Sequence, residues 1–187
     1  MLSEKLGHIL DKPLAPLARA LPVHPNLVTI LGMLIASSSA VILPKSLFLG
    51  GLAILAGGAC DLLDGIIARV NGKKTDFGAF LDSTLDRVAD GFIFFGLAWR
   101  FLLQGEHVAL LTTVLALIAS LVISYARARA EAVGSSCRVG IMERPERILL
   151  IALGCITTYI WPAVLIVAAL SWATVVQRIL HVRKQLA

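Results

Sequence analysis

Paired aspartates stand out in a chain whose surrounding residues are mostly apolar. Asp61 and Asp64 are three positions apart, and Asp82 and Asp86 are four positions apart. On a helix, each of these spacings places both carboxylates of a pair on the same face. A carboxylate in a hydrocarbon environment costs about 2.5 kcal/mol or more, so residues of this kind usually carry a function. The two pairs are therefore the first candidates for chemistry.

Carboxylates that face one another need positive charge between them if they are to stay ionised. Arg69 and Arg87 are close in sequence and supply two positive charges at most. Divalent cations are the natural source of the remaining positive charge, because clustered hard oxygen ligands suit Mg²⁺ or Mn²⁺. A two-metal site stabilises the attacking and the leaving oxygen in phosphoryl transfer. The alternative is a set of buried Asp–Arg pairs that fixes helix packing, although such pairs seldom give net stability.

Small residues lie beside these aspartates. Gly65 follows Asp64, Ala68 lies one helical turn further on, and Gly78 precedes the second pair. Their size allows a bulky ligand to approach the backbone. The alternative is close packing of helices through small side chains, which explains Gly57 and part of Gly65.

The composition indicates which elements position these side chains. Of 187 residues, 58% are hydrophobic and 16% are charged. A soluble domain is about 45–50% apolar and about 25% charged. A chain of this size cannot bury so much apolar surface in one core, so its solvent is lipid. This excludes a disordered chain, a nucleic-acid-binding domain and a small secreted scaffold, and three cysteines without metal-like spacing imply no disulfide framework.

Six segments approach the length of about 20 mostly apolar residues that a membrane span requires. The predicted spans are 26–43, 47–69, 77–103, 108–130, 145–160 and 162–183. The expected fold is thus an all-α polytopic membrane protein with six transmembrane helices. The bundle covers 26–183, and the whole chain, 1–187, is expected to form a single domain.

The first 21 residues have a different pattern. Leucines recur every three or four positions with charged residues between them, which is typical of an amphipathic helix lying in the membrane interface. Pro13 is expected to break this helix into two pieces. The segment lacks the continuous apolar region of a cleavable signal peptide. Residues 1–21 are therefore predicted to be an interfacial helix.

The distribution of positive charge predicts the orientation. With a cytoplasmic N-terminus and six spans, fifteen Lys and Arg side chains fall on or near the inner side, and only Lys45 and Arg100 fall on the outer side. This bias supports both the number of spans and the orientation. We expect a multi-pass plasma-membrane protein whose termini and carboxylates face the cytoplasm. The net charge of +5 then requires no nucleic-acid partner.

Eight of the residues form one long motif. The sequence fits D-x2-D-G-x2-A-R-x8-G-x3-D-x3-D, which resembles the signature of the CDP-alcohol phosphotransferase family at every fixed position. The matching residues are Asp61, Asp64, Gly65, Ala68, Arg69, Gly78, Asp82 and Asp86. The resemblance implies an enzyme that transfers a lipid phosphoryl group from a CDP-linked donor to an alcohol and releases CMP. It also implies a homodimer.

The resemblance further implies a role for each motif residue. Asp61, Asp64 and Asp82 would bind the metals with help from Asp86, which would also be the base that accepts the hydroxyl proton. The CDP moiety would lie against Gly65, Ala68, Arg69 and Gly78. Pro25, Asn26 and Thr29 resemble the P-N-x-x-T element of the family, so Asn26 and Thr29 join this set. The alternative is that Asn26 caps a helix and Thr29 bonds to its own backbone.

Arginines from three predicted helices indicate the acceptor. Arg127, Arg147 and Arg178 lie at similar depth near the inner side, and converging guanidinium groups match phosphate oxygens. For other inner arginines, such as Arg144, the alternative explanation is the ordinary excess of positive charge on the cytoplasmic side of a membrane protein. Two stretches resemble the inositol-phosphate branch of the family: S-Y-x-R-A-x-A-E, which begins at Ser124, and E-R-x-E-R. The resemblance adds Ser124 to the three arginines as a fourth residue expected at the acceptor phosphate. The alternative acceptor is glycerol 3-phosphate.

Two other classes of function fit the sequence less well. A metal transporter would place carboxylates near the midplane and break its helices there, whereas these acids lie toward one side. A scaffold would have no reason to pair carboxylates on two helix faces. Asp90 continues the face of Asp82 and Asp86 but lies outside the motif, and Arg87 or a residue of a neighbouring helix is its expected partner.

Overall fold

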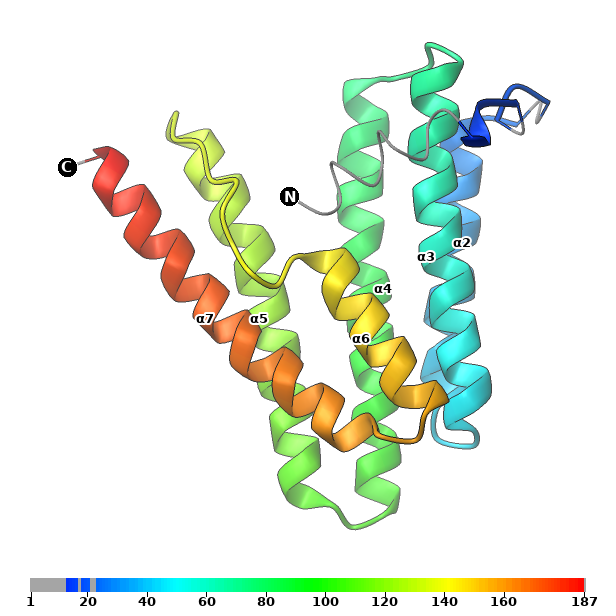
Figure 1. Ribbon diagram of the computed structural model, residues 1–187, viewed down its shortest axis with the longest axis vertical. Helices are drawn as coiled ribbons and strands as arrows, with labels where there is room; N and C mark the ends of the chain where they lie inside the picture. Colours follow the sequence, from blue (N-terminus) through cyan, green and yellow to red (C-terminus); the bar gives the residue numbers. More distant parts are fainter. Residues whose placement is uncertain (1–12, 17, 21–22, 187) are drawn as a thin grey trace.

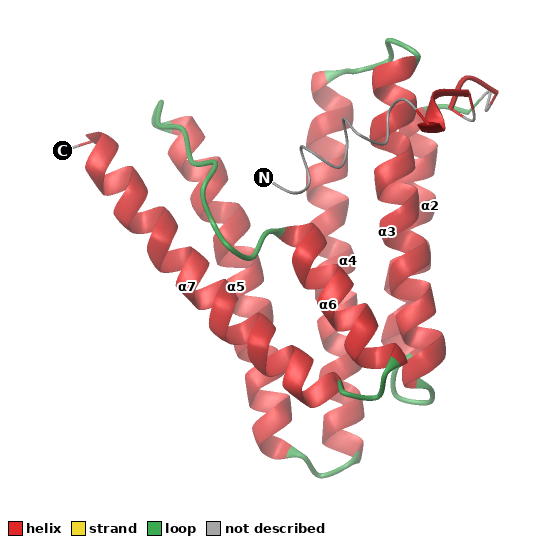
Figure 2. Cartoon of the chain, viewed as in Figure 1, coloured by secondary structure: helices red, strands yellow, loops and turns green. Residues whose placement is uncertain are grey.

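The structure is a computed structural model that describes residues 13–16, 18–20 and 23–186. Its long elements are all helices, and the described residues contain no strand (Figure 2). The helices are α2 (Pro25–Ile42), α3 (Leu47–Val70), α4 (Asp76–Leu103), α5 (His107–Ala132), α6 (Arg144–Ile156) and α7 (Ile160–Leu186). Each of the six ranges predicted from the sequence overlaps one of these helices, so the all-α fold is confirmed.

Side-chain caps fix where the first three of these helices begin. Ser46 Oγ accepts a hydrogen bond from Leu49 N at 3.3 Å, and Thr75 Oγ1 accepts one from Gly78 N at 3.0 Å. His24, and not Asn26, caps α2, because its Nδ1 accepts from Asn26 N at 3.3 Å. The capping alternative for Asn26 is therefore wrong.

The helices form two groups that spread apart toward one end of the molecule (Figure 1). α2 packs against α3 and α4, and α5 packs against α7. α4 joins the groups by packing on α5, while α6 lies against α3 and α7. α3 and α4 are consecutive helices joined by a short loop, but they are not among the closely packed pairs. The two helices instead flank the space into which their carboxylates point.

α6 is shorter than predicted at its C-terminal end. It ends at Ile156 and not at residue 160, because Thr158 adopts a left-handed φ of 65° and α7 begins at Ile160. Its N-terminus lies part-way along the molecule, since the segment before it runs down between the two helix groups (Figure 1). The first turn of α6 therefore lies deep in the molecule.

The descending segment, residues 133–143, is held tightly against α7. Met142 N donates to Thr174 Oγ1 at 3.0 Å, and Arg178 Nε donates to Val139 O at 2.9 Å. A Cβ on Gly140, whose φ is 145°, would lie 2.5 Å from Thr174 Cγ2. Only glycine fits this approach, so the path of the segment is specified by its sequence.

Small residues also bring α2 close to α3. A Cβ on Gly57 would lie 2.6 Å from Ala36 Cβ and 2.9 Å from Gly32 O. The packing alternative is therefore correct for Gly57. Gly65 differs, since a Cβ there would meet only the flexible end of Arg69, at 3.1 Å.

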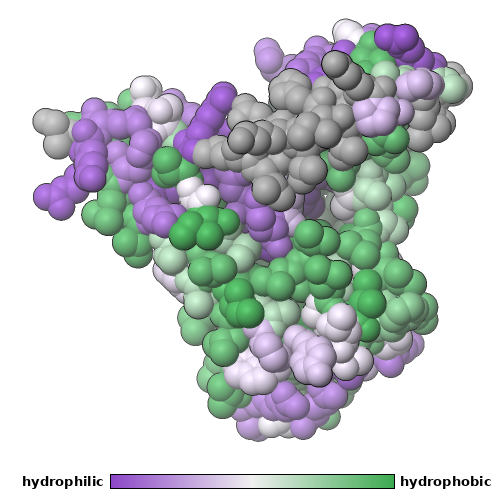
Figure 3. All heavy atoms as spheres, in the orientation of Figure 1, coloured by the Kyte–Doolittle hydropathy of each residue, from purple (hydrophilic) through white to green (hydrophobic). Residues whose placement is uncertain are grey.

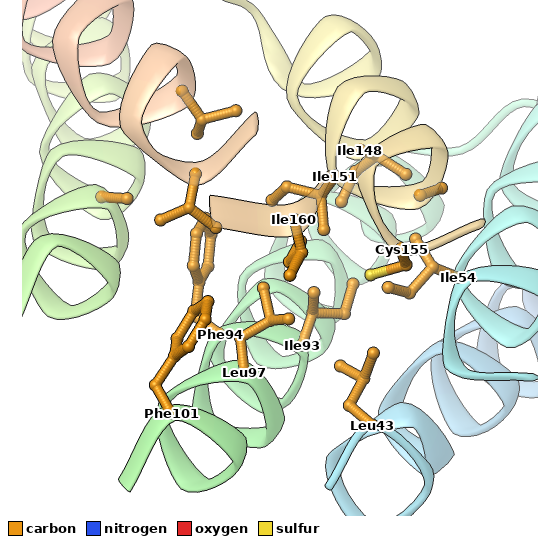
Figure 4. Packing of buried hydrophobic residues seen from close by; sticks show 14 of the residues in the cluster. Leu43, Ile54, Ile93, Phe94, Leu97, Phe101, Ile148, Ile151, Cys155 and Ile160 are labelled. Carbon is orange, nitrogen blue, oxygen red and sulfur yellow. The ribbon is translucent and has the colours of Figure 1, made fainter. Parts of the chain in front are cut away.

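The apolar core lies in the half of the molecule away from the spread ends. Leu43, Ile54 and Phe94 pack against Ile151 and Ile160 (Figure 4). Four of these residues come from α3, α4, α6 and α7, and Leu43 directly follows α2. The core holds the two groups together at this end and leaves the other end open.

Among the described residues, four helices are long and apolar enough to cross a membrane: α2, α3, α5 and α7. α4 has 28 residues but carries several charges, and α6 has only 13 residues. Apolar side chains form a broad band over the face drawn in Figure 3, and hydrophilic ones gather at its upper and lower ends. The chain is therefore a membrane protein.

The predicted interfacial segment lies mostly outside the described residues. Residues 13–16 and 18–20 are helical. Ala18 is buried against Ile66 and Ile67 of α3, and Asn71 Nδ2 donates to Ala18 O at 3.2 Å. This part of the N-terminal segment is thus attached to the end of α3.

Candidate active site

Three aspartates meet in the space between α3 and α4. Asp61, Asp64 and Asp82 each offer a carboxylate oxygen, and these oxygens lie within 4.8 Å of one another. Asp64 is the most buried of the three, with 5% of its surface exposed. We refer to these residues as the carboxylate triad. The helical spacing in the sequence places Asp61 and Asp64 on one side of this space, and Asp82 faces them from α4.

The triad fits a divalent cation. Asp64 Oδ2 and Asp82 Oδ1 are buried and have no hydrogen-bond partner. A buried carboxylate oxygen without a partner is costly, and a hard cation removes that cost. A set of Asp–Arg pairs alone leaves these two oxygens unexplained, so the purely structural alternative does not account for the triad.

Arg144 supplies the positive charge that the sequence did not assign to this site. Its Nη1 lies 3.1 Å from Asp61 Oδ2 and 2.8 Å from Asp86 Oδ1, and its Nε lies 3.3 Å from Asp90 Oδ1. In the sequence Arg144 has the appearance of an inner-side surface charge. The only feature of the sequence that could have indicated a role at the site is its position directly before Pro145, at the start of a helix. Because α6 begins deep in the molecule, this first-turn arginine reaches the carboxylates.

Asp86 lies beside the triad and has its own partners. Besides Arg144, it faces Arg87, whose Nη1 lies 3.6 Å from Asp86 Oδ2. Arg87 Nη1 also donates to Ser83 O one turn earlier. The carboxylate of Asp86 is thus fixed by two guanidinium groups and remains on the wall of a cavity.

Asp90 pairs with neighbouring helices and not with Arg87. Its Oδ2 accepts from Arg147 Nη2 at 3.2 Å and from Ser120 Oγ at 3.0 Å. With Arg144 on Oδ1, both oxygens are used. The aspartate left open by the motif is therefore the centre of a buried ion-pair network.

A smaller cavity, of about 670 Å³, opens on one side of the triad. Its lining includes Asn26, Thr29, Asp64, Gly65, Ala68, Arg69, Gly78 and Asp82. All six residues expected from the resemblance at a CDP site therefore share one cavity. Thr29 Oγ1 also donates a hydrogen bond to Pro25 O at 3.2 Å, which agrees with the alternative that Thr29 bonds to the backbone of its own helix.

A larger cavity, of about 960 Å³, lies on the other side. Its lining includes Asp61, Asp82, Asp86, Ser124, Arg127, Arg144, Arg147 and Arg178. The four residues expected at an acceptor phosphate site thus line the same cavity as three of the carboxylates. Asp82 lines both cavities, so the two meet at the triad.

The three arginines expected at the acceptor phosphate site are held differently. Arg127 is exposed and pairs with Glu131 at 3.0 Å on its own helix. Arg178 is buried and donates to Val139 O at 2.9 Å and to Ile123 O at 2.6 Å. Arg147 is the most buried, at 1% exposure, and its Nε has no partner. Arg178 also anchors the descending segment, whereas Arg147 retains an unused donor.

Known proteins have similar sequences. A model of the CDP-alcohol phosphatidyltransferase family matches residues 22–180. The archaetidylinositol phosphate synthase of Methanothermobacter thermautotrophicus is 40% identical over 178 residues, covering 91% of this chain and 89% of that protein. The phosphatidylinositol phosphate synthase of Mycobacteroides abscessus is 38% identical over 193 residues, covering 98% and 88%.

Solved structures are also similar over most of the chain. The Mycobacterium tuberculosis phosphatidylinositol phosphate synthase with CDP-DAG bound has a TM-score of 0.83 and 35% identity, covering 90% of this chain and 92% of that one. The same enzyme with manganese and citrate has a TM-score of 0.84 and 35% identity, covering 90% and 88%.

The carboxylate site, the fold and these similarities lead to one assignment. The manganese complex of a similar enzyme and the carboxylate triad support use of a divalent metal ion. With a family model that spans most of the sequence, the chain belongs to the CDP-alcohol phosphatidyltransferase family and is a membrane transferase of phospholipid synthesis.

Proposed function

We propose that this enzyme transfers a phosphatidyl-type group from a CDP-linked lipid to a hydroxyl of an inositol phosphate and releases CMP. Relatives at 38–40% identity that act in inositol phospholipid synthesis support this acceptor. The lipid tail is either diacylglycerol or an archaeal ether lipid, since both present the same apolar surface.

The observation that carries the proposal is the meeting of two cavities at the carboxylate triad. Asp82 lines both of them, with motif residues around the smaller cavity and arginines around the larger one. A transferase needs a donor and an acceptor whose reacting atoms lie about 3–3.5 Å apart. Two sites that join at the same carboxylates provide that arrangement.

The smaller cavity is the proposed donor site. Gly65, Ala68 and Gly78 leave room for the CDP moiety, and a Cβ on Gly78 would lie 3.2 Å from Asn26 Oδ1. Arg69 supplies positive charge to the diphosphate, and Asn26 and Thr29 line the same wall.

Asp61, Asp64, Asp82 and Asp86 are the proposed metal ligands, for two Mg²⁺ or Mn²⁺ ions. The unpartnered oxygens of Asp64 and Asp82 support the first three assignments together with their spacing. When bound, such ions neutralise the charge that develops on the diphosphate as CMP leaves.

Asp86 is the proposed catalytic base. It lines the larger cavity, where it accepts the proton of the acceptor hydroxyl. The hydroxyl oxygen forms a bond to the lipid-linked phosphorus, and the bond from that phosphorus to CMP breaks. Arg144 and Arg87 fix the carboxylate, so it acts mainly by orienting the hydroxyl.

The larger cavity is the proposed acceptor site, with Ser124, Arg127, Arg147 and Arg178 around the acceptor phosphate. The unused Nε of the buried Arg147 is the strongest support. Glycerol 3-phosphate also carries a phosphate, but the similar enzymes favour inositol phosphate.

The membrane arrangement is part of the proposal. We infer that α4 and α6 complete six spans, since α4 is long enough and α6 is lengthened by the segment that precedes it. The chain would then form a single domain, 1–187, with an interfacial N-terminal helix over 1–21. Positive charge favours a plasma-membrane enzyme with a cytoplasmic active site and cytoplasmic termini. A homodimer surrounded by membrane lipids is the expected assembly.

A panel of acceptors tests the function. Purified protein is given CDP-diacylglycerol and Mg²⁺, and CMP release is followed with inositol 1-phosphate, glycerol 3-phosphate or free inositol. We expect release that depends on inositol 1-phosphate. Strong release with glycerol 3-phosphate and none with inositol 1-phosphate would reverse the choice of acceptor.

A further inference from the structure

Asp90 is a buried carboxylate that lies outside both the motif and the triad. It is one turn beyond Asp86 on α4, and 2% of it is exposed. Its two oxygens accept from Arg144, Arg147 and Ser120 at 3.0–3.3 Å. A charge this deeply buried is stable only when partners satisfy it. Asp90 therefore has a fixed geometry that joins α4 to α5 and α6.

Arg147 is the first group that Asp90 orients. Its Nη2 bonds to Asp90, and its Nη1 donates to Met142 O at 3.4 Å. The remaining Nε is buried and has no partner, while the side chain lines the larger cavity. The guanidinium plane of Arg147 is thus set by Asp90, and one of its donors is left for an anion.

Arg144 is the second group that Asp90 orients. Its Nε is bonded to Asp90, so its Nη1 is directed at Asp86 and Asp61. Without the bond at Nε, the guanidinium could rotate about its side chain and leave Asp86. One carboxylate therefore controls the arginine beside the base and the arginine beside the acceptor cavity.

Resting on the proposed function, we propose that Asp90 is a positioning residue for the transfer reaction. It keeps Arg147, which receives the acceptor phosphate, in register with Arg144, which holds Asp86 against the acceptor hydroxyl. The phosphate and the hydroxyl belong to one acceptor molecule, so their two binding points must keep a fixed separation. Asp90 itself lines neither cavity and acts only through the arginines.

Asp90→Asn tests this role, because the amide has the same shape but no charge. Initial rates of CMP release are measured while inositol 1-phosphate and CDP-diacylglycerol are varied in turn. A displacement of about 1 Å costs about 10²-fold in rate, so we expect kcat to fall by that order. The KM for inositol 1-phosphate should rise about ten-fold, while the KM for the CDP-lipid stays within about two-fold.

Asp90→Glu separates positioning from packing. Glu keeps the charge but is larger than Asp, whereas Asn has the size of Asp without the charge. A positioning role predicts that Asp90→Glu retains more activity than Asp90→Asn. A packing role predicts the reverse order. If Asp90→Asn does not fold, Asp90→Glu still tests the proposal. Its displaced carboxylate should raise the KM for inositol 1-phosphate but not the KM for the CDP-lipid.

Thr113→Val is the matched control, because it removes a buried polar contact that lies within α5 and does not involve Asp90. Thr113 is fully buried and donates to Ala109 O at 2.7 Å, away from the arginines. We expect wild-type KM values for both substrates. The inference is overturned if folded Asp90→Asn has wild-type constants, or if the KM values of both substrates rise equally. Wild-type protein without inositol 1-phosphate-dependent release would instead contradict the proposed function.

Discussion

The five aspartates of this site have different environments. Asp64 and Asp82 each have a buried oxygen without a partner, whereas Asp61, Asp86 and Asp90 all contact Arg144. The first two suit a cation, and Asp86 and Asp90 are already neutralised by arginines. The role of each carboxylate is therefore decided by its partners, and substitutions at the five positions should not have equal effects.

Replacing Asp86 by Asn should abolish turnover without unfolding the protein. The amide oxygen still accepts a bond from Arg144, but it cannot take up the hydroxyl proton. Loss of a general base costs about 10²–10⁴-fold in rate. CMP release and the melting temperature in detergent are measured together, with Glu106→Gln on the opposite end as control. Normal release by Asp86→Asn would remove it from the mechanism.

Arg127 and Arg147 should respond differently to replacement by Ala. Both changes should raise the KM for inositol 1-phosphate. Arg127→Ala breaks an exposed pair with Glu131, which is worth at most about 1 kcal/mol. Arg147→Ala leaves Asp90 without one of its buried partners, and breaking a buried pair costs about 3–5 kcal/mol. Melting temperature and KM distinguish the two, and a stable Arg147→Ala protein would contradict the importance of the pair.

At the scale of the elements, short contacts between helices set the position of the carboxylates. α2 approaches α3 through Gly57 and packs on α4 as well, so it fixes both sides of the triad. The descending segment brings the start of α6 to the same depth. The site is thus built by two departures from a regular bundle, a close glycine contact and a short helix.

Gly57→Ala and Gly58→Ala form a matched test of the glycine contact. A Cβ at 57 would lie 2.6 Å from Ala36 Cβ and 2.9 Å from Gly32 O, whereas one at 58 would lie 3.7 Å from Ile148 Cγ2. Overpacking costs about 1–3 kcal/mol, so Gly57→Ala should lower the melting temperature and the rate. Gly58→Ala should be neutral or more stable, by up to about 1 kcal/mol. Equal melting temperatures would refute the close packing.

At the scale of the whole molecule, the apolar core at one end leaves the other end free to open. The spread of α5 and α7 from α2, α3 and α4 creates the larger cavity, and Asp61 and Asp82 of the triad line it from α3 and α4. Donor and acceptor can therefore approach the same carboxylates from two sides. The residues of the triad come from α3 and α4, within one of these groups.

Removal of divalent ions should stop CMP release, and Mg²⁺ or Mn²⁺ should restore it. Binding at a preformed site also stabilises the fold, by about 2.7 kcal/mol at an ion concentration of 100 Kd. We expect Mn²⁺ to raise the melting temperature of the wild-type protein but not of Asp64→Asn, whose buried oxygen lies in the triad. Full activity in excess chelator would contradict the metal assignment.

The sequence by itself determined the helices, the membrane environment and the motif. Apolar runs of spanning length place the helices to within a few residues, because this signal is local. The i,i+3 and i,i+4 spacings likewise fixed which carboxylates share a face. These features depend on neighbouring residues, so the sequence was sufficient.

Only the tertiary structure decided how distant charges pair. From the sequence, Arg144 could be an ordinary surface charge on the inner side. In the structure it contacts three aspartates, because the segment before α6 descends into the molecule. Asp90 could have faced Arg87, but the positions of α5 and α6 give it Ser120 and Arg147 instead. Pairing across a bundle depends on where each helix starts and how closely it packs. No local spacing in the sequence contains that information.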